Sequence, residues 1–105
     1  MAFTSYLENG CLTVVLTGEI DHQCAKSCID AIASKIEVYT PRECVLDFGE
    51  VSFMDSSGIA VVINALRNMT KINGMLSVGG LQSQPLRVFQ VSGIDRLVKI
   101  KEEVS

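Results

Sequence analysis

Residues 53–58 (Phe-Met-Asp-Ser-Ser-Gly) place a carboxylate and two hydroxyls where an apolar stretch gives way to a helix-like pattern. Asp and Ser are favoured at helix starts because their side-chain oxygens accept hydrogen bonds from N–H groups of the first turn. Gly58 can allow tight packing there, since it has no side chain. Local chemistry alone therefore favours a helix cap, with the serines as first-turn residues.

A catalytic use of the same residues needs partners that the sequence supplies poorly. Ser56 could act as a nucleophile, with His22 as its base and Asp21 or Asp55 orienting the base. The chain has one histidine and lacks the Gly-x-Ser-x-Gly elbow. It also lacks a Walker-type phosphate loop, and two adjacent glycines at 79–80 do not make a dinucleotide fingerprint. We expect no enzyme activity, no catalytic residue and no cofactor.

Four cysteines, Cys11, Cys24, Cys28 and Cys44, raise the question of metal or disulfide chemistry. There is no Cys-x-x-Cys pair, and His22 is the only nearby histidine, so the spacing does not match a metal site. An apolar core large enough for stability makes disulfides unnecessary. We expect reduced, structural cysteines and no bound metal.

The composition is that of an ordinary globular domain. The 105 residues are 48% hydrophobic and 20% charged, with a formal net charge of -3. The basic residues are scattered, so neither a nucleic acid nor a membrane surface is an expected partner. The N-terminus does not resemble a signal peptide, and the apolar run at 59–63 is too short to span a bilayer. These features predict a cytoplasmic protein.

Strand-like and helix-like stretches alternate after an opening hairpin. Asn9-Gly10 favours a tight turn because both residues tolerate positive φ, and Asp21 is a suitable N-cap for a first helix. We predict a single α/β domain, residues 1–105, with a mixed sheet that starts with the hairpin and helices packed against it. Strands are expected at 2–8, 11–17, 44–48, 75–78 and 97–100. The first helix should bury Ala25, Cys28, Ile29, Ile32 and Ile36.

Two further helices are expected, one over residues 57–71 and one capped by Ser83. The second helix carries more apolar residues than one buried stripe needs. Its large side chains at helical spacing are expected to face the core: Ile59, Val62, Ile63, Leu66 and Met69. Val61 is rotated by about 100° from Val62. We therefore predict that Val61 is exposed beside the loop that carries Ser56.

Residues 53–58 resemble the signature of anti-sigma-factor antagonists of the STAS family, a domain shared with sulfate transporters. In that family an Asp-Ser-Ser-Gly or Asp-Ser-Thr-Gly loop precedes the second helix. The resemblance also covers residues 16–21 (Leu-Thr-Gly-Glu-Ile-Asp), 45–48 (Val-Leu-Asp-Phe) and 91–94 (Val-Ser-Gly-Ile), in the family's order. Within the family, the loop is most similar to that of the sporulation-type antagonist.

The resemblance implies a regulatory binding protein switched by phosphorylation. Unphosphorylated antagonists bind an anti-sigma factor that is a serine kinase, and the sigma factor is released. The kinase, which itself binds the ATP, phosphorylates the first serine of the loop, here Ser56, and a serine phosphatase restores the hydroxyl. The residues expected to contact the kinase are Asp21, Asp55, Ser56, Ser57, Gly58 and Val61.

An alternative within the same family is a STAS scaffold subunit of a stressosome-like or lipid-transport complex. It would share the fold without the phosphorylation cycle. Family members also commonly continue into a further C-terminal helix. Residues 101–105 are expected to supply at most its first turn.

Overall fold

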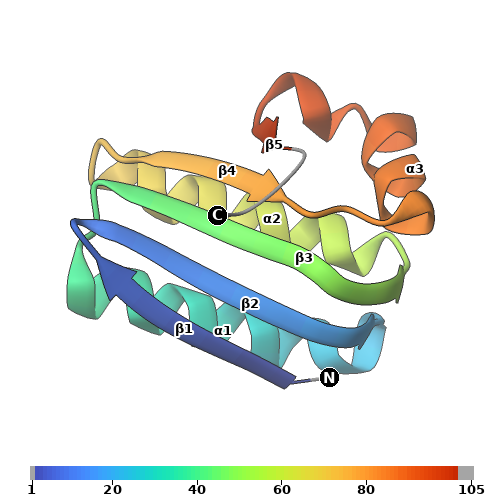
Figure 1. Ribbon diagram of the computed structural model, residues 1–105, viewed down its shortest axis with the longest axis horizontal. Helices are drawn as coiled ribbons and strands as arrows, with labels where there is room; N and C mark the ends of the chain where they lie inside the picture. Colours follow the sequence, from blue (N-terminus) through green and yellow to red (C-terminus); the bar gives the residue numbers. More distant parts are fainter. Residues whose placement is uncertain (1, 102–105) are drawn as a thin grey trace.

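The computed structural model describes residues 2–101, in which helices and strands alternate after a hairpin (Figure 1). Five strands form one sheet in the order β1-β2-β3-β4-β5. The β1–β2 pair is antiparallel and the other neighbours are parallel. The strands are β1 (Ala2–Glu8), β2 (Cys11–Ile20), β3 (Glu43–Met54), β4 (Met75–Gly79) and β5 (Lys99–Lys101). The helices are α1 (His22–Tyr39), α2 (Ser57–Lys71) and α3 (Ser83–Ser92), followed by a short 3-10 helix, η1 (Ile94–Arg96).

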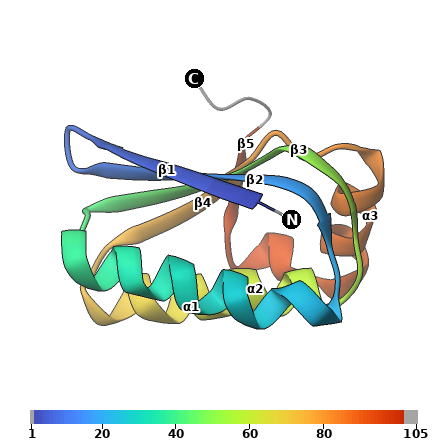
Figure 2. The same cartoon turned by 90° about the horizontal axis from the view of Figure 1, so that it is seen from below.

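Helices α1 and α2 lie side by side on one face of the sheet, and α3 lies near the end of β3 (Figure 2). Because side chains alternate between the two faces of a strand, every second residue of the central strands points at the helices. Leu12, Val14 and Leu16 of β2 are fully buried in this way, as are Leu46 and Phe48 of β3. The predicted mixed sheet with packed helices is confirmed.

The opening hairpin and the first helix follow the sequence signals. Asn9 and Gly10 both have positive φ, 52° and 79°. Asp21 is the N-cap of α1, and its Oδ1 accepts from the N–H groups of Gln23 and Cys24 at 3.0 and 3.1 Å. The buried residues of α1 are Ala25, Cys28, Ile32 and Ile36, while Ile29 is half-buried at the edge of the same stripe.

Strand β3 is longer than predicted because the segment after Phe48 is a bulge and not a loop. The pair Val15–Asp47 is followed by Thr17–Glu50, so β3 has one residue more than β2 at this point. The Asp47 carboxylate stabilises the bulge by accepting from the Gly49 N–H at 2.8 Å. The strand then continues to Met54, where the Ser56 loop begins.

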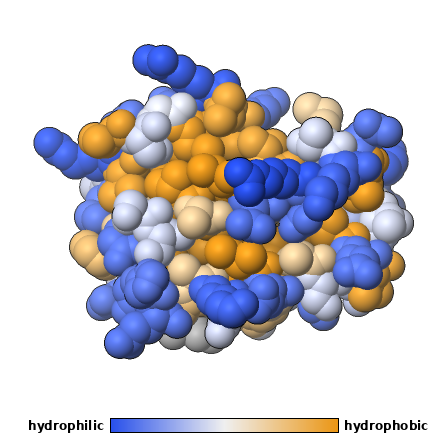
Figure 3. Space-filling view, turned by 180° about the vertical axis from the view of Figure 1, so that it is seen from behind, coloured by the Kyte–Doolittle hydropathy of each residue, from blue (hydrophilic) through white to orange (hydrophobic). Residues whose placement is uncertain are grey.

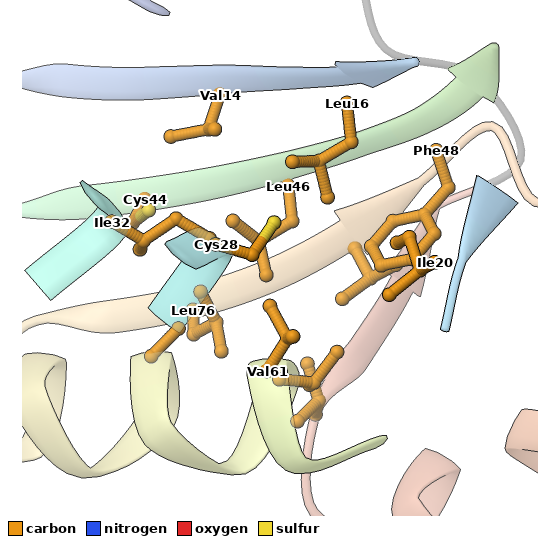
Figure 4. Packing of buried hydrophobic residues seen from close by; sticks show 14 of the residues in the cluster. Val14, Leu16, Ile20, Cys28, Ile32, Cys44, Leu46, Phe48, Val61 and Leu76 are labelled. Atoms are coloured by element: carbon orange, nitrogen blue, oxygen red, sulfur yellow. The ribbon is translucent and has the colours of Figure 1, made fainter. Parts of the chain in front are cut away.

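The prediction that Val61 is exposed is wrong. Val61 has 0% of its surface exposed, and it points from α2 towards the sheet (Figure 4). The buried residues of α2 are Gly58, Val61, Val62, Ala65 and Met69. The predicted stripe is rotated from this one, and its members Ile59, Ile63 and Leu66 are only half-buried. The physical reason is that the small residues Gly58 and Ala65 let α2 approach the sheet closely, with Val61 between them.

Two details of the C-terminal half also differ from expectation. Ser83 does not cap α3: Gln82 is the N-cap residue, and its side-chain amide donates to the Gly49 carbonyl at 2.9 Å. The last strand begins at Lys99 and not at residue 97, because η1 turns the chain after Gly93. The expected start of a further helix beyond Lys101 lies outside the described residues.

Candidate functional site

The loops that end β2 and β3 meet at one edge of the sheet because the two strands are parallel neighbours. Ile20 and Met54 are paired across the strands, and the Asp55 N–H donates to the Ile20 carbonyl at 3.1 Å. Asp21 directly follows Ile20 and starts α1, while Asp55 precedes α2. The structure therefore brings the two predicted acidic residues to the starts of adjacent helices.

A network of short hydrogen bonds fixes the turn from β3 into α2. Asp55 Oδ1 accepts from the Ser57 N–H at 2.8 Å, and the Asp55 carbonyl accepts from the Gly58 N–H at 3.0 Å. Ser56 occupies the N-cap position, and its side chain makes no capping hydrogen bond. Asp55 thus serves the predicted capping role from one residue before the N-cap.

The three residues after Asp55 differ sharply in accessibility. Ser56 is exposed, Ser57 is half-buried and Gly58 is buried. A Cβ added to Gly58 would lie 2.6 Å from Met54 Cε and 3.2 Å from Met54 Cβ, so a side chain here would require Met54 to move. Of the two adjacent hydroxyl residues, Ser56 is therefore the one that a second protein can reach.

Electrostatics at this edge are dominated by carboxylates. The hydrogen bond from the Cys24 backbone N–H, with help from the Cys24 side chain, lowers the pKa of Asp21 below its ordinary value. Asp21 therefore carries a full negative charge at neutral pH. His22, the proposed base of the enzyme alternative, is exposed, and within residues 2–101 no hydrogen bond joins it to Ser56.

A hollow of about 450 Å³ lies next to Ser56, between α2 and α3. The Gln84 amide holds α3 against the end of β3: its Oε1 accepts from the Met54 N–H and its Nε2 donates to the Met54 carbonyl, both at 2.9 Å. The hollow is lined by Ser56, Ile59, Gln84, Arg87, Val88, Val91 and Ser92. Apolar side chains also reach the surface on this helix-covered side of the molecule (Figure 3).

Sequence reasoning missed this hollow. Its α3 residues, Gln84, Arg87, Val88 and Val91, have the i, i+3, i+4, i+7 spacing of one helix face. That spacing could have identified a second helix face next to the Ser56 loop. A pattern of buried residues does not reveal this helix face, because Arg87 and Val91 are exposed.

Cys28 and Cys44 are both buried. Burial raises the pKa of Cys28 to about 11 and that of Cys44 to about 12, with neighbouring cysteines adding to each shift. Both thiols are therefore protonated at neutral pH.

Residues 2–101 contain no cluster of three or more side chains suited to a metal ion. No helix within that range has both the length and the apolar character needed to cross a membrane.

Comparisons with known proteins point to one family. A profile of the STAS domain matches residues 3–105. The anti-sigma-B factor antagonist of Listeria monocytogenes is 30% identical over 93 residues, which are 86% of this chain and 78% of that protein.

Two solved structures are similar to this fold over nearly its whole length. The anti-sigma factor antagonist SpoIIAA in its unphosphorylated form is 25% identical, with a TM-score of 0.83 over 97% of this chain and 90% of that chain. The Bacillus cell fate determinant SpoIIAA in its phosphorylated form has the same identity and a TM-score of 0.73, over 97% and 93%. With the family profile covering all but two residues, this chain belongs to the STAS domain family.

Proposed function

We propose that this chain is an anti-sigma factor antagonist whose partner binding is switched by phosphorylation of Ser56. The observation that carries the proposal is the exposed Ser56 side chain, held at the start of α2 by a turn that Asp55 fixes. Similar proteins are anti-sigma factor antagonists, and SpoIIAA exists in unphosphorylated and phosphorylated forms. The role is that of a cytoplasmic binding protein without enzyme activity or a cofactor of its own.

The switching reaction uses chemistry that the partner supplies. An anti-sigma factor serine kinase binds the unphosphorylated chain and releases its sigma factor. The Ser56 Oγ attacks the γ-phosphorus of the kinase's ATP, the bond to ADP breaks, and the hydroxyl proton leaves to a base on the kinase. A serine phosphatase later hydrolyses the phosphoester. The loop residues Asp21, Asp55, Ser57 and Gly58 present the hydroxyl to the kinase.

Charge explains why the modification weakens binding without unfolding the chain. Phosphate adds about -1.5 to -2 charges at pH 7. At the N-terminus of α2 that charge is locally favourable, because the helix dipole is positive there. At the partner surface it adds to the carboxylates of Asp21 and Asp55, so a complementary protein surface meets like charge and extra bulk.

Phosphosite mapping with matched variants tests the proposal. The chain is incubated with each anti-sigma factor kinase of its source organism and ATP, and the modified peptide is located by mass spectrometry. Ser56→Ala should bind the kinase and resist modification, whereas Ser57→Ala, one residue away, should be modified. Labelled Ser56→Ala with unlabelled Ser57→Ala would overturn the assignment.

The same experiment separates the scaffold alternative. Purification from source cells should recover a small serine kinase with the chain. Recovery of a permease or a large assembly, together with no phosphate transfer to any variant, would favour the scaffold subunit.

A further inference from the structure

The hollow between α2 and α3 contains one cationic side chain. Arg87 belongs to the same helix face as Gln84, which is fixed to the end of β3 by two hydrogen bonds. Arg87 comes three residues after Gln84 and is therefore held on the side of α3 that faces the start of α2. The two hydrogen bonds of Gln84 therefore fix the position of the Arg87 backbone relative to the end of β3.

The guanidinium of Arg87 is available for a ligand. Arg87 is exposed and forms no ion pair with any residue from 2 to 101. A guanidinium presents several N–H donors in a planar fork, which fits the oxygens of a phosphoryl group. Ser56 and Arg87 both line this hollow, so the two residues border one shared space.

We propose that Arg87 binds the phosphoryl group of phosphorylated Ser56 across the hollow between α2 and α3. This contact rests on the proposed phosphorylation of Ser56, and it adds the residue that binds the phosphoryl group once Ser56 carries it. The phosphoryl oxygens accept charge-assisted hydrogen bonds from the Arg87 guanidinium, and this contact holds the group over the hollow.

The contact gives the switch a second mode of action. Ile59, Val88 and Val91 form the apolar wall of the hollow and are accessible when Ser56 is unmodified. A phosphoryl group held by Arg87 covers this wall with charged, hydrated atoms. Phosphorylation therefore removes an apolar contact surface in addition to adding negative charge near Asp55.

The test measures the second pKa of the phosphoserine, which is near 6 when no cation is close. Phosphoserine is incorporated at position 56 during translation, so the measurement does not depend on any kinase. The pKa is read from the ³¹P NMR shift as a function of pH in the wild-type background, Arg87→Gln and Arg67→Gln. Arg67 is an exposed arginine on α2, about 16 Å along the helix from Ser56 at 1.5 Å per residue. Its variant loses the same net charge far from the phosphate.

A nearby guanidinium stabilises the dianion, so Arg87→Gln should raise the phosphoserine pKa by about half a pH unit at low salt. Arg67→Gln should leave it unchanged, and added salt should shrink the difference. The methyl resonances of Val88 and Val91 should shift on phosphoserine incorporation in the wild-type background, and less in Arg87→Gln. Equal pKa values in all three proteins, or equal rises in both variants, would overturn the contact.

The outcome is independent of the kinase assay. If a kinase modifies a residue other than Ser56, the proposed function fails while the measured phosphate–Arg87 contact stands. If Ser56 is the phosphosite and the pKa does not depend on Arg87, only the contact is refuted.

Discussion

Replacing Val61 with alanine should destabilise the protein strongly, because it removes two methyl groups from the centre of the core. Val61 has 0% of its surface exposed and lies between α2 and the sheet. Loss of two buried carbons removes about 1.6 kcal/mol of transfer free energy, and the cavity left behind brings the total to about 2–3 kcal/mol. For a domain of this size that lowers the thermal midpoint by roughly 9–14 °C.

Urea unfolding followed by far-UV circular dichroism is a suitable assay, since the chain has no tryptophan. Val38→Ala is the matched control: Val38 is also helical, in α1, but is 70% exposed. Both variants replace a helical valine with alanine, so the difference between them reports mainly burial. The free energy of unfolding should fall for Val61→Ala and change by less than about 0.5 kcal/mol for Val38→Ala. Equal, small changes would contradict the packing of α2 described above.

Two further predictions follow from titratable groups. Asp21→Ala should lower the thermal midpoint at neutral pH; the folded pKa of Asp21 lies below its ordinary 3.8, so this difference is full above that value and shrinks as the pH falls through the folded pKa. A constant difference down to pH 2 would refute the cap's dependence on charge. Cys28 and Cys44, with pKa values raised to about 11 and 12, should react with iodoacetamide at pH 8 more slowly than Cys11 and Cys24. Peptide mapping over time measures this, and uniform rates would refute it.

The elements that sequence predicts well are those bounded by residues with strong local preferences. Asn9-Gly10 makes the hairpin turn, and Asp21 caps α1. Each of these preferences is set by the residue and its immediate neighbours. The boundaries of α2, residues 57–71, follow for the same reason.

Features that depend on close approach between elements are harder to predict. The buried stripe of α2 passes through Gly58 and Ala65, which contribute little to a count of large apolar side chains. Weighting by size therefore rotates the expected stripe and places Val61 outside it. The bulge after Phe48 is similar: Gly49 and Glu50 resemble a loop until the partner strand is known.

The candidate site also combines features set by local sequence with features set by contacts between distant parts of the chain. The Asp55–Gly58 turn is local, so its residues could be identified from sequence, as could the neighbouring Asp21. The hollow beside Ser56 lies between α2 and α3, and Gln84 fixes α3 to Met54 at the end of β3, 30 positions away in the chain. No local pattern contains that contact, and the proposed role of Arg87 depends on it.

Release of a sigma factor tests the central claim most directly. A complex of the cognate anti-sigma factor kinase with its sigma factor is titrated with the unmodified chain or with the chain carrying phosphoserine at position 56, and free sigma factor is measured by size-exclusion chromatography. We expect the unmodified chain to release the sigma factor and the phosphorylated chain to leave the complex intact. Equal release by both forms, or release by neither, would contradict the proposed switch.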